Sequence, residues 1–320
     1  MRGKIGLEEH FAIADTVDGA RAFVEEPAWV DLRARLLDLQ EKRLSEMDQH
    51  GMEKMIVSLH APGIQRIEDA GKAIDVAHRA NDLLAQEVTK RHDRFEAFAA
   101  LPMQEPEAAA KELRRCVRDC GFKGALVNGY SQLGNANNCV YYDLPQYWDF
   151  WGVVEELDVP LYLHPREPSE RRAYEGHPWL IGPAYGFAAE TGLHALRLLG
   201  SGLFDKYPRL TLILGHLGEG LPFNLHRIDQ RIAWAPKGYP AKRKVSEYFQ
   251  QNIYITTAGN CRTQSLISCL LEVGADRILF STDYPFENVR EAAEWFDSVS
   301  ISETDRLKIG RLNARKLFKI

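Results

Sequence analysis

The chain of 320 residues lacks a long apolar run, a pattern of paired cysteines and a strong excess of one charge. A membrane-spanning helix needs about 20 consecutive apolar residues, so the sequence predicts none. The first residues, MRGKIGLEEHF, contain no apolar signal core, which argues against export. The five cysteines include no CxxC pair. We therefore expect buried, reduced thiols in a cytoplasmic protein.

The charge balance argues against a polyanionic partner. The formal net charge is −5 and the isoelectric point is about 6.1, which disfavours nucleic acid as the main ligand. One compact basic stretch, AKRKV at residues 241–245, is short enough to be a solvated loop. The sequence predicts neither a nucleic-acid-binding nor a membrane protein.

Short apolar segments recur along the chain and predict strands. Most are continuous rather than alternating, which is typical of strands buried on both faces. They lie at residues 4–9, 54–59, 95–101, 123–128, 159–164, 210–216, 253–259 and 278–283. Helical spacing follows each of them, and the stretch over residues 27–51 predicts one helix that ends at Gly51.

Eight buried strands alternating with helices predict a single (β/α)8 barrel domain over residues 1–320. The competing fold is a doubly wound open sheet, which usually carries a glycine-rich turn after its first strand. The segment GLEEHF at residues 6–11 is not such a turn. Two long loops, at residues 129–143 and 165–183, follow predicted strands, and we expect them to be functional.

Polar side chains stand at the carboxyl ends of these strands, which open onto one face of a barrel. They are Glu8 and His10, Asn128, His164, His216 and Asp283. Glu8 and His10 are two residues apart, so both side chains leave an extended backbone on the same side. The side chain of Glu9 then points the other way, and we expect it to face the surrounding helices or a surface partner. His60 and Ala61, after the second strand, are further candidates to line the mouth.

Each of these residues has a structural interpretation when taken alone. A histidine at a strand end is commonly held by a hydrogen bond, and Asp283 before YPFEN can serve as a turn or capping residue. Together, Glu8, His10, His164 and Asp283 predict a mixed histidine and carboxylate site for a divalent ion such as Zn²⁺ or Mn²⁺. The lack of thiolate ligands argues against copper(I) and iron–sulfur chemistry.

His216 has a built-in partner, because Glu219 lies three residues on at the start of the next helix. A carboxylate next to an imidazole sets its tautomer and favours its protonated form. We expect His216 to be a metal neighbour or an acid/base group. The structural alternative is a histidine that only caps the sixth strand.

The segments LEEHF, VPLYLHP, LILGHLGEGLPF, YITTAGN and DRILFSTDYPFEN resemble the decarboxylase branch of the amidohydrolase superfamily, and the similarity runs along the whole chain. The resemblance implies a distorted (β/α)8 barrel, assembled as a homotetramer or homodimer. It also implies one Zn²⁺ or Mn²⁺ per subunit, no organic cofactor, and non-oxidative release of CO₂ from a small aromatic acid. His10 together with VNGYSQ favours 2,6-dihydroxybenzoate, with 2,3-dihydroxybenzoate and salicylate as alternatives.

The same resemblance assigns roles to individual positions. It implies metal ligands at Glu8, His10, His164 and Asp283. It further implies that Asp283 protonates the ring carbon that bears the carboxylate, and that His216 and Glu219 act as a dyad beside the metal. The implied substrate contacts are Phe23, Asn128, Arg227 and Phe286.

Two departures from the hydrolases of the superfamily bear on the activity. Glu8 stands where hydrolases usually have a histidine, and Asn128 stands where many have a carboxylated lysine. Both argue against a dinuclear hydrolase. The remaining rivals are a mononuclear metal hydrolase of a lactone or amide, a decarboxylase of an aliphatic dienoic acid, for which Glu8 is unfavourable, and a non-catalytic binding protein.

Overall fold

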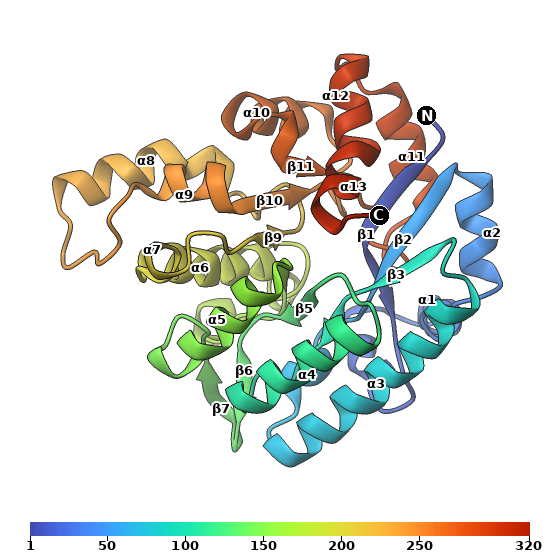
Figure 1. The fold of residues 1–320 in the computed structure, drawn as a ribbon, viewed down its shortest axis with the longest axis horizontal. Coiled ribbons are helices and arrows are strands. Elements are labelled where there is room, and N and C mark those ends of the chain that lie inside the picture. The colour runs from blue at the N-terminus through green and yellow to red at the C-terminus, as the bar shows by residue number, and fades with distance from the viewer.

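Parallel strands form a ring at the centre of the molecule (Figure 1). The computed structural model describes residues 1–320, apart from the side chain of Phe23. The strands of the ring are β1 (Lys4–Phe11), β2 (Met52–Leu59), β3 (Phe95–Ala97), β4 (Ala99–Ala100), β5 (Ala125–Asn128), β8 (Leu161–His164), β9 (Leu212–Leu214), β10 (Ile253–Thr256) and β11 (Ile278–Leu279). Each predicted strand is confirmed, with shorter bounds for most of them.

The third barrel strand is divided at Phe98. Its first half, β3, pairs with β2, and its second half, β4, pairs with β5, so the two ladders β1-β2-β3 and β4-β5-β8-β9-β10-β11 join there. Counting β3 and β4 as one strand gives eight parallel strands in chain order. The predicted (β/α)8 barrel is confirmed, whereas its extent as one domain over residues 1–320 stays a prediction.

The barrel closes between β11 and β1 without a strand ladder. The backbone N–H groups of Leu7 and Glu8 lie 3.1 and 2.6 Å from the Ser281 hydroxyl oxygen, to which they donate. The N–H of His10 donates to the carbonyl oxygen of Tyr284 at 2.6 Å. The loop that follows β11 therefore replaces the missing part of the eighth strand.

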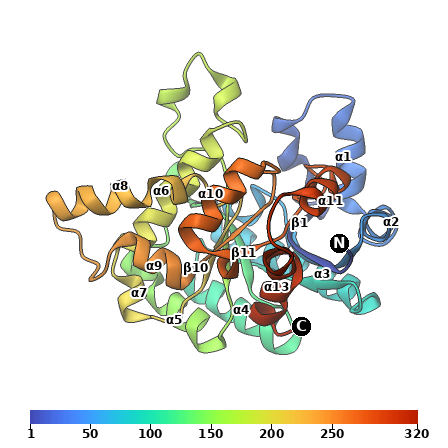
Figure 2. The same ribbon diagram turned by 90° about the horizontal axis from the view of Figure 1, so that it is seen from above.

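Helices cover the outside of the ring (Figures 1 and 2). They are α1 (Ala28–Leu37), α2 (Lys42–Gln49), α3 (Ala70–Lys90), α4 (Pro106–Asp119), α5 (Trp148–Leu157), α6 (Gly186–Gly200), α7 (Leu203–Lys206), α8 (Leu221–Trp234), α9 (Val245–Asn252), α10 (Thr263–Val273), α11 (Val289–Ser298), α12 (Glu303–Leu307) and α13 (Asn313–Phe318). A π-helical segment, Lys308–Leu312, links the last two. None of the helices that the structure describes has the length and apolarity needed to span a membrane.

The apolar core has two main layers. The larger one lies between the strands and the helices. The smaller one fills the inside of the ring and includes Ile5, Leu7, Tyr162 and Leu279, with Phe318 from α13 packed against them. Because the ring is filled in this way, the polar residues at the carboxyl ends of the strands lie above a closed floor rather than along a pore.

The single helix predicted over residues 27–51 is wrong. The structure has two helices, α1 and α2, separated by a break at Asp38. The Asp38 carboxylate accepts hydrogen bonds from the backbone N–H groups of Gln40, Glu41 and Lys42, at 3.1, 2.9 and 2.6 Å. A short acidic side chain that binds nearby N–H groups competes with a continuous helix, so it begins a new one.

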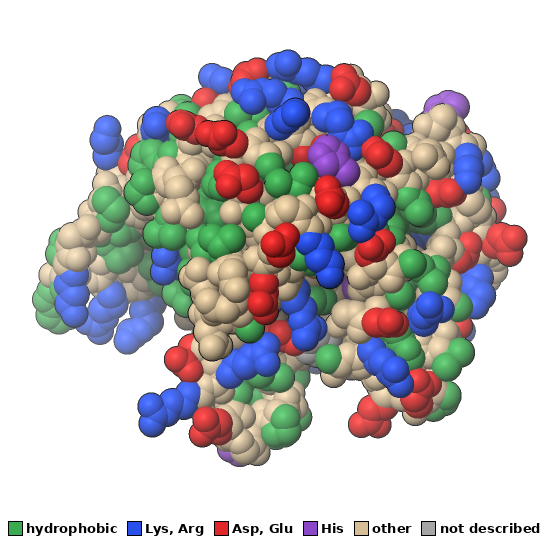
Figure 3. Space-filling model, turned by 90° about the horizontal axis from the view of Figure 1, so that it is seen from below, with side chains coloured by type: hydrophobic (Ala, Val, Ile, Leu, Met, Phe, Trp, Pro, Cys, Tyr) green, Lys and Arg blue, Asp and Glu red, His purple; other side chains and the backbone are tan. Residues whose placement is uncertain are grey.

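Two segments project beyond the carboxyl ends of the strands (Figure 2). One contains the short helical turn Val17–Phe23 before α1, and the other is the long loop after β8, with the turns Arg172–Tyr174 and Pro178–Leu180. In the space-filling view the surface is hollowed between these two projections (Figure 3). The other long loop, after β5, contains a hairpin of β6 (Ser131–Leu133) and β7 (Asn135–Val140).

Candidate metal centre and active site

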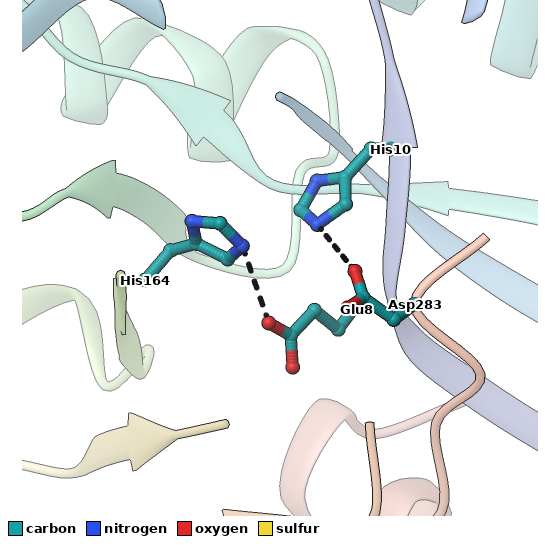
Figure 4. A group of neighbouring side chains, drawn as sticks. All are labelled: Glu8, His10, His164 and Asp283. Carbon is teal, nitrogen blue, oxygen red and sulfur yellow. Dashed lines mark ion pairs between the residues drawn. The ribbon is translucent and has the colours of Figure 1, made fainter. Parts of the chain in front are cut away.

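Four side chains from three strand ends meet at the mouth of the barrel (Figure 4). Glu8 and His10 come from β1, His164 from the end of β8, and Asp283 from the loop after β11. One ligand atom from each lies within 4.8 Å of the others. His164 Nε2 is 3.2 Å from Glu8 Oε1, and His10 Nε2 is 3.3 Å from Asp283 Oδ1. The grouping predicted from the sequence is confirmed.

The donor atoms of this cluster fit a divalent metal ion. Glu8 Oε1 and His10 Nε2 are buried and have no hydrogen-bond partner among the described residues. Burying such polar atoms without a partner costs about 1–3 kcal/mol each. Two imidazole nitrogens and two carboxylate oxygens that converge on one point are a typical ligand set for Zn²⁺ or Mn²⁺.

Neighbouring groups orient the ligands. His164 Nδ1 donates to the carbonyl oxygen of Pro165 at 2.9 Å, which leaves the lone pair on Nε2. His10 Nδ1 lies 3.2 Å from the Ser58 hydroxyl oxygen. Glu8 Oε2 accepts hydrogen bonds from the Tyr162 hydroxyl and, at 3.1 Å, from Thr256. These partners were not predicted from the sequence, although Tyr162 lies two residues before His164 and so shares its side of β8.

His216 and Glu219 form the predicted dyad. His216 Nδ1 is 2.7 Å from Glu219 Oε1, and its Nε2 is 3.5 Å from Asp283 Oδ2 and 3.7 Å from Glu8 Oε1. Burial alone would lower the pKa of His216, but the carboxylates of Glu219, Glu8 and Asp283 raise it well above 6.5. His216 is therefore held in its charged form beside the cluster.

The carboxylates of the cluster are held in their ionised form. Burial would raise the pKa of Asp283, but the neighbouring imidazoles of His10 and His216 lower it well below 3.8. The pKa of Glu8 is also lowered, because the neighbouring imidazoles of His216 and His164 outweigh its burial.

Three residues of the site have strained backbone conformations. His216, Glu219 and Asp283 have φ angles of +49°, +55° and +64°. Left-handed conformations are unfavourable for residues other than glycine and cluster at functional sites. The surrounding structure holds these three side chains in place.

The prediction for Glu9 is wrong in one of its two alternatives, the surface partner. Its side chain is buried, so the expected surface partner is absent among the described residues, and it accepts hydrogen bonds from the loop after β11. The reason is the loop after β11, which covers this side of the strand and supplies the hydrogen-bond donors. The Arg43 guanidinium of the outer helix α2 nevertheless lies near enough to act on its charge. Burial raises the pKa of Glu9 to about 7, even though hydrogen bonds from Thr282 lower it.

The cluster opens into a cavity of about 190 Å³. Its lining is mostly apolar and consists of Ala20, Val24, Ala61, His164, Pro183, Phe187, His216, Asp283, Phe286 and Glu287. A second cavity of about 290 Å³ shares His216, Asp283 and Glu287 with it. Ala61 was expected at the mouth, whereas Glu287 was not predicted, since nothing in the sequence distinguishes it from other acidic residues on helix ends.

The four predicted substrate contacts differ in position. Phe286 lines the cavity, with its ring centroid 5.7 Å from that of His10. Asn128 is buried and does not line the cavity, and its amide nitrogen lies 3.4 Å from the carbonyl oxygens of Leu59 and His60. Arg227 is exposed on α8 and does not line this cavity. The side chain of Phe23 lies outside the described part of the structure.

Comparison with known proteins identifies the family of this chain. A family model described as Amidohydrolase matches residues 17–320. The chain is 60% identical to gamma-resorcylate decarboxylase from Rhizobium sp. (strain MTP-10005), covering 100% of this chain and 99% of that protein. The chain therefore belongs to the amidohydrolase family.

Two solved structures of dihydroxybenzoate decarboxylases resemble this one along its whole length. A 2,6-dihydroxybenzoate decarboxylase complexed with 2,6-dihydroxybenzoate has a TM-score of 0.98 at 60% identity, covering 100% of both chains. A dihydroxybenzoic acid decarboxylase from Polaromonas sp. JS666, with bound manganese and the inhibitor 2-nitroresorcinol, has a TM-score of 0.98 at 58% identity, covering 100% of this chain and 97% of that one.

Proposed function

We infer that this chain is a carboxy-lyase that converts 2,6-dihydroxybenzoate to resorcinol and CO₂ with the help of a divalent metal ion. The observation that carries this inference is the buried cluster of Glu8, His10, His164 and Asp283 at the end of a mostly apolar cavity. The similarity to gamma-resorcylate decarboxylases along the whole chain supports the same activity.

We propose one Mn²⁺ or Zn²⁺ per subunit as the native ion, with no organic cofactor. Glu8, His10, His164 and Asp283 would hold it, and the manganese in the Polaromonas structure supports this assignment. Bound there, the ion would act as a Lewis acid that stabilises negative charge on the oxygen atoms of the substrate.

The reaction replaces a carbon–carbon bond by a carbon–hydrogen bond. Direct loss of CO₂ would leave an unstable aryl carbanion, so the ring carbon that bears the carboxylate must gain a proton before the bond breaks. The ortho-hydroxyl oxygen donates electron density into the ring, Asp283 delivers the proton, and the electrons of the breaking bond restore aromaticity. Asp283 is suited to this role because its carboxylate faces both the cluster and the cavity.

His216 would supply that proton to Asp283. In the resting site Asp283 is ionised and His216 is charged, with His216 Nε2 3.5 Å from Asp283 Oδ2. Transfer across this contact would give a protonated Asp283 next to the substrate. Glu219 would hold the His216 ring and stabilise its positive charge.

The walls of the cavity would position the aromatic ring. Phe286 stands at an edge-to-face angle to His10, and Phe187 and Val24 supply further apolar surface. By excluding water, these walls would strengthen the interactions of the charged groups with the substrate. Contacts from Phe23, Asn128 and Arg227 stay predictions.

We also propose that the chain forms a homo-oligomer, either a dimer or a tetramer, in the cytoplasm. On α8 the side chains of Phe223 and Trp234 are 86% and 78% exposed, and large exposed apolar groups are common at interfaces. The five cysteines are all unpaired in the structure, which supports a reducing compartment. The expected burial of the thiols holds for Cys116 and Cys269 but is wrong for Cys261, which is exposed.

The test is a measurement of CO₂ release from 2,6-, 2,3- and 2,4-dihydroxybenzoate and salicylate, each with Mn²⁺ or Zn²⁺. We expect the highest kcat/KM with 2,6-dihydroxybenzoate, and incorporation of labelled bicarbonate into resorcinol in the reverse direction. Faster turnover of 2,3-dihydroxybenzoate or salicylate would show that this compound, and not 2,6-dihydroxybenzoate, is the preferred substrate. Release of acid from a lactone or amide, without CO₂ from any benzoate, would favour the metal hydrolase.

A further inference from the structure

The loop that carries Asp283 has little regular structure of its own. β11 ends at Leu279, and residues 280–284 run beside β1 without a ladder. Asp283 adopts a φ of +64° in this loop, which is unfavourable for a residue with a side chain. Something outside the loop must therefore hold Asp283 in the orientation that places its carboxylate in the cluster.

The Glu9 carboxylate makes four hydrogen bonds to this loop. Its Oε1 accepts from the Ser281 hydroxyl at 3.3 Å and from the Thr282 N–H at 2.9 Å. Its Oε2 accepts from the Thr282 hydroxyl at 2.6 Å and from the Tyr284 N–H at 3.3 Å. These donors flank Asp283 on both sides, so Glu9 constrains the backbone immediately before and after it.

The Arg43 side chain forms a second connection between β1 and this loop. The Arg43 side chain of α2 is buried, and its Nη2 donates to the carbonyl oxygen of His10. The same guanidinium lies 4.7 Å from the centroid of the Tyr284 ring, at the end of the loop. Arg43 and Glu9 thus join β1 to the loop where no strand ladder does so.

We propose that Glu9 is a positioning residue, which holds the backbone on both sides of Asp283 so that the Asp283 carboxylate reaches the metal cluster. Each Glu9 oxygen accepts a bond from one backbone N–H, and a glutamine has only one such oxygen. In Glu9→Gln the side-chain NH₂ would face either the Thr282 or the Tyr284 N–H, and the loop would have to shift. The effect on metal binding follows from this geometry alone, whereas the effect on turnover also rests on the proposed function.

The experiment compares Mn²⁺ binding to metal-free wild type and Glu9→Gln by titration calorimetry. We expect the variant to bind Mn²⁺ about 10- to 100-fold more weakly, as for other residues that orient metal ligands. With 2,6-dihydroxybenzoate and saturating Mn²⁺, kcat should fall while KM changes little. Thr282→Val, which removes one of the four bonds, should also weaken Mn²⁺ binding, but by a smaller factor than Glu9→Gln. This variant replaces Glu9→Gln in the test if Glu9→Gln does not fold.

The matched control is Glu112→Gln, the same chemical change at a buried carboxylate between α3 and α4. It should lower the thermal midpoint but bind Mn²⁺ like the wild type. Wild-type Mn²⁺ affinity in folded Glu9→Gln would overturn the positioning role, as would equal weakening in both glutamine variants. If wild type released no CO₂, the proposed function would fail, but the comparison of Mn²⁺ affinities would still decide the role of Glu9.

Discussion

The barrel mouth and the α3–α4 contact both bury carboxylates, but their surroundings differ. Between α3 and α4, Glu112 accepts hydrogen bonds from Asn81 at 2.7 Å and from Arg115 at 2.8 and 2.9 Å, and it contacts His78 at 2.9 Å. Burial would raise the pKa of Glu112, but Arg115 and Asn81 lower it below 4.5. Here the protein's own groups satisfy the carboxylate, so its role is structural.

At the mouth, buried ligand atoms face one another with no hydrogen-bond partner, as Glu8 Oε1 and His10 Nε2 do among the described residues. The difference indicates that burial alone does not identify a functional carboxylate. A functional carboxylate is identified by unpartnered atoms that converge on one point, because only an added ion satisfies them all.

The largest effect is expected when a ligand at the mouth is removed. His164→Ala should leave the protein without bound metal and without CO₂ release above background, because the remaining ligands bind the ion too weakly. Elemental analysis after dialysis measures the loss of metal. His78→Ala, which removes an imidazole from the Glu112 side instead, should retain a full metal complement. Equal metal contents in both variants would exclude His164 from the ligand set.

Replacement of the proton donor should have the next largest effect. Asp283→Asn should lower kcat by about 10³-fold, within the range for loss of a general acid. Equilibrium dialysis with saturating Mn²⁺ should still show bound 2,6-dihydroxybenzoate. Asp276→Asn, at a surface pair with Lys308, should turn over normally. Near-normal turnover of Asp283→Asn would show that another group protonates the ring.

Loss of the Glu219 charge should have a smaller effect, visible in the pH profile. Glu219 helps to raise the pKa of His216, so Glu219→Gln should lower that pKa. The His216 proton is then lost at lower pH, and the alkaline decline of kcat should begin at lower pH than in wild type. At neutral pH we expect kcat to fall by about 10- to 100-fold. If the alkaline limb of the kcat profile were unchanged, Glu219 would have no effect on the pKa of His216.

The smallest effect on turnover is expected at the structural carboxylate. Glu112→Gln should leave kcat unchanged and lower the free energy of unfolding by about 1–3 kcal/mol at pH 7. Because the folded pKa of Glu112 is lowered, its stabilisation is complete above about pH 4.5 and is lost as the pH falls through the folded value. Urea unfolding of wild type and variant should therefore give a stability difference that narrows below pH 4.5. A constant difference would contradict an ionised, paired Glu112.

The fold and the metal cluster could be predicted from the sequence because both depend on simple regularities. Continuous apolar segments indicate strands buried on both faces, and a barrel brings the carboxyl ends of its strands to one face. The sequence alone therefore predicts that four ligands lie together, without knowledge of any contact between them. They are Glu8, His10, His164 and Asp283.

Features that depend on the path of loops could not be predicted in this way. The partners of Glu9 come from the loop after β11, whose path does not appear in the alternation of residues. The break at Asp38 was missed because an apolar stripe continues through α1 and α2, while the hydrogen bonds that divide them are local. The contact of the Asn128 amide with the end of β2, outside the lining of the cavity, likewise depends on the fold.

The most direct test of the metal centre is a titration of metal-free protein with Mn²⁺ while CO₂ release from 2,6-dihydroxybenzoate is measured. Four converging ligands in each chain predict that the rate rises in proportion to added Mn²⁺ and stops rising at one equivalent per chain. Full CO₂ release before any metal is added, or no release at any Mn²⁺ concentration, would contradict a metal-dependent decarboxylase.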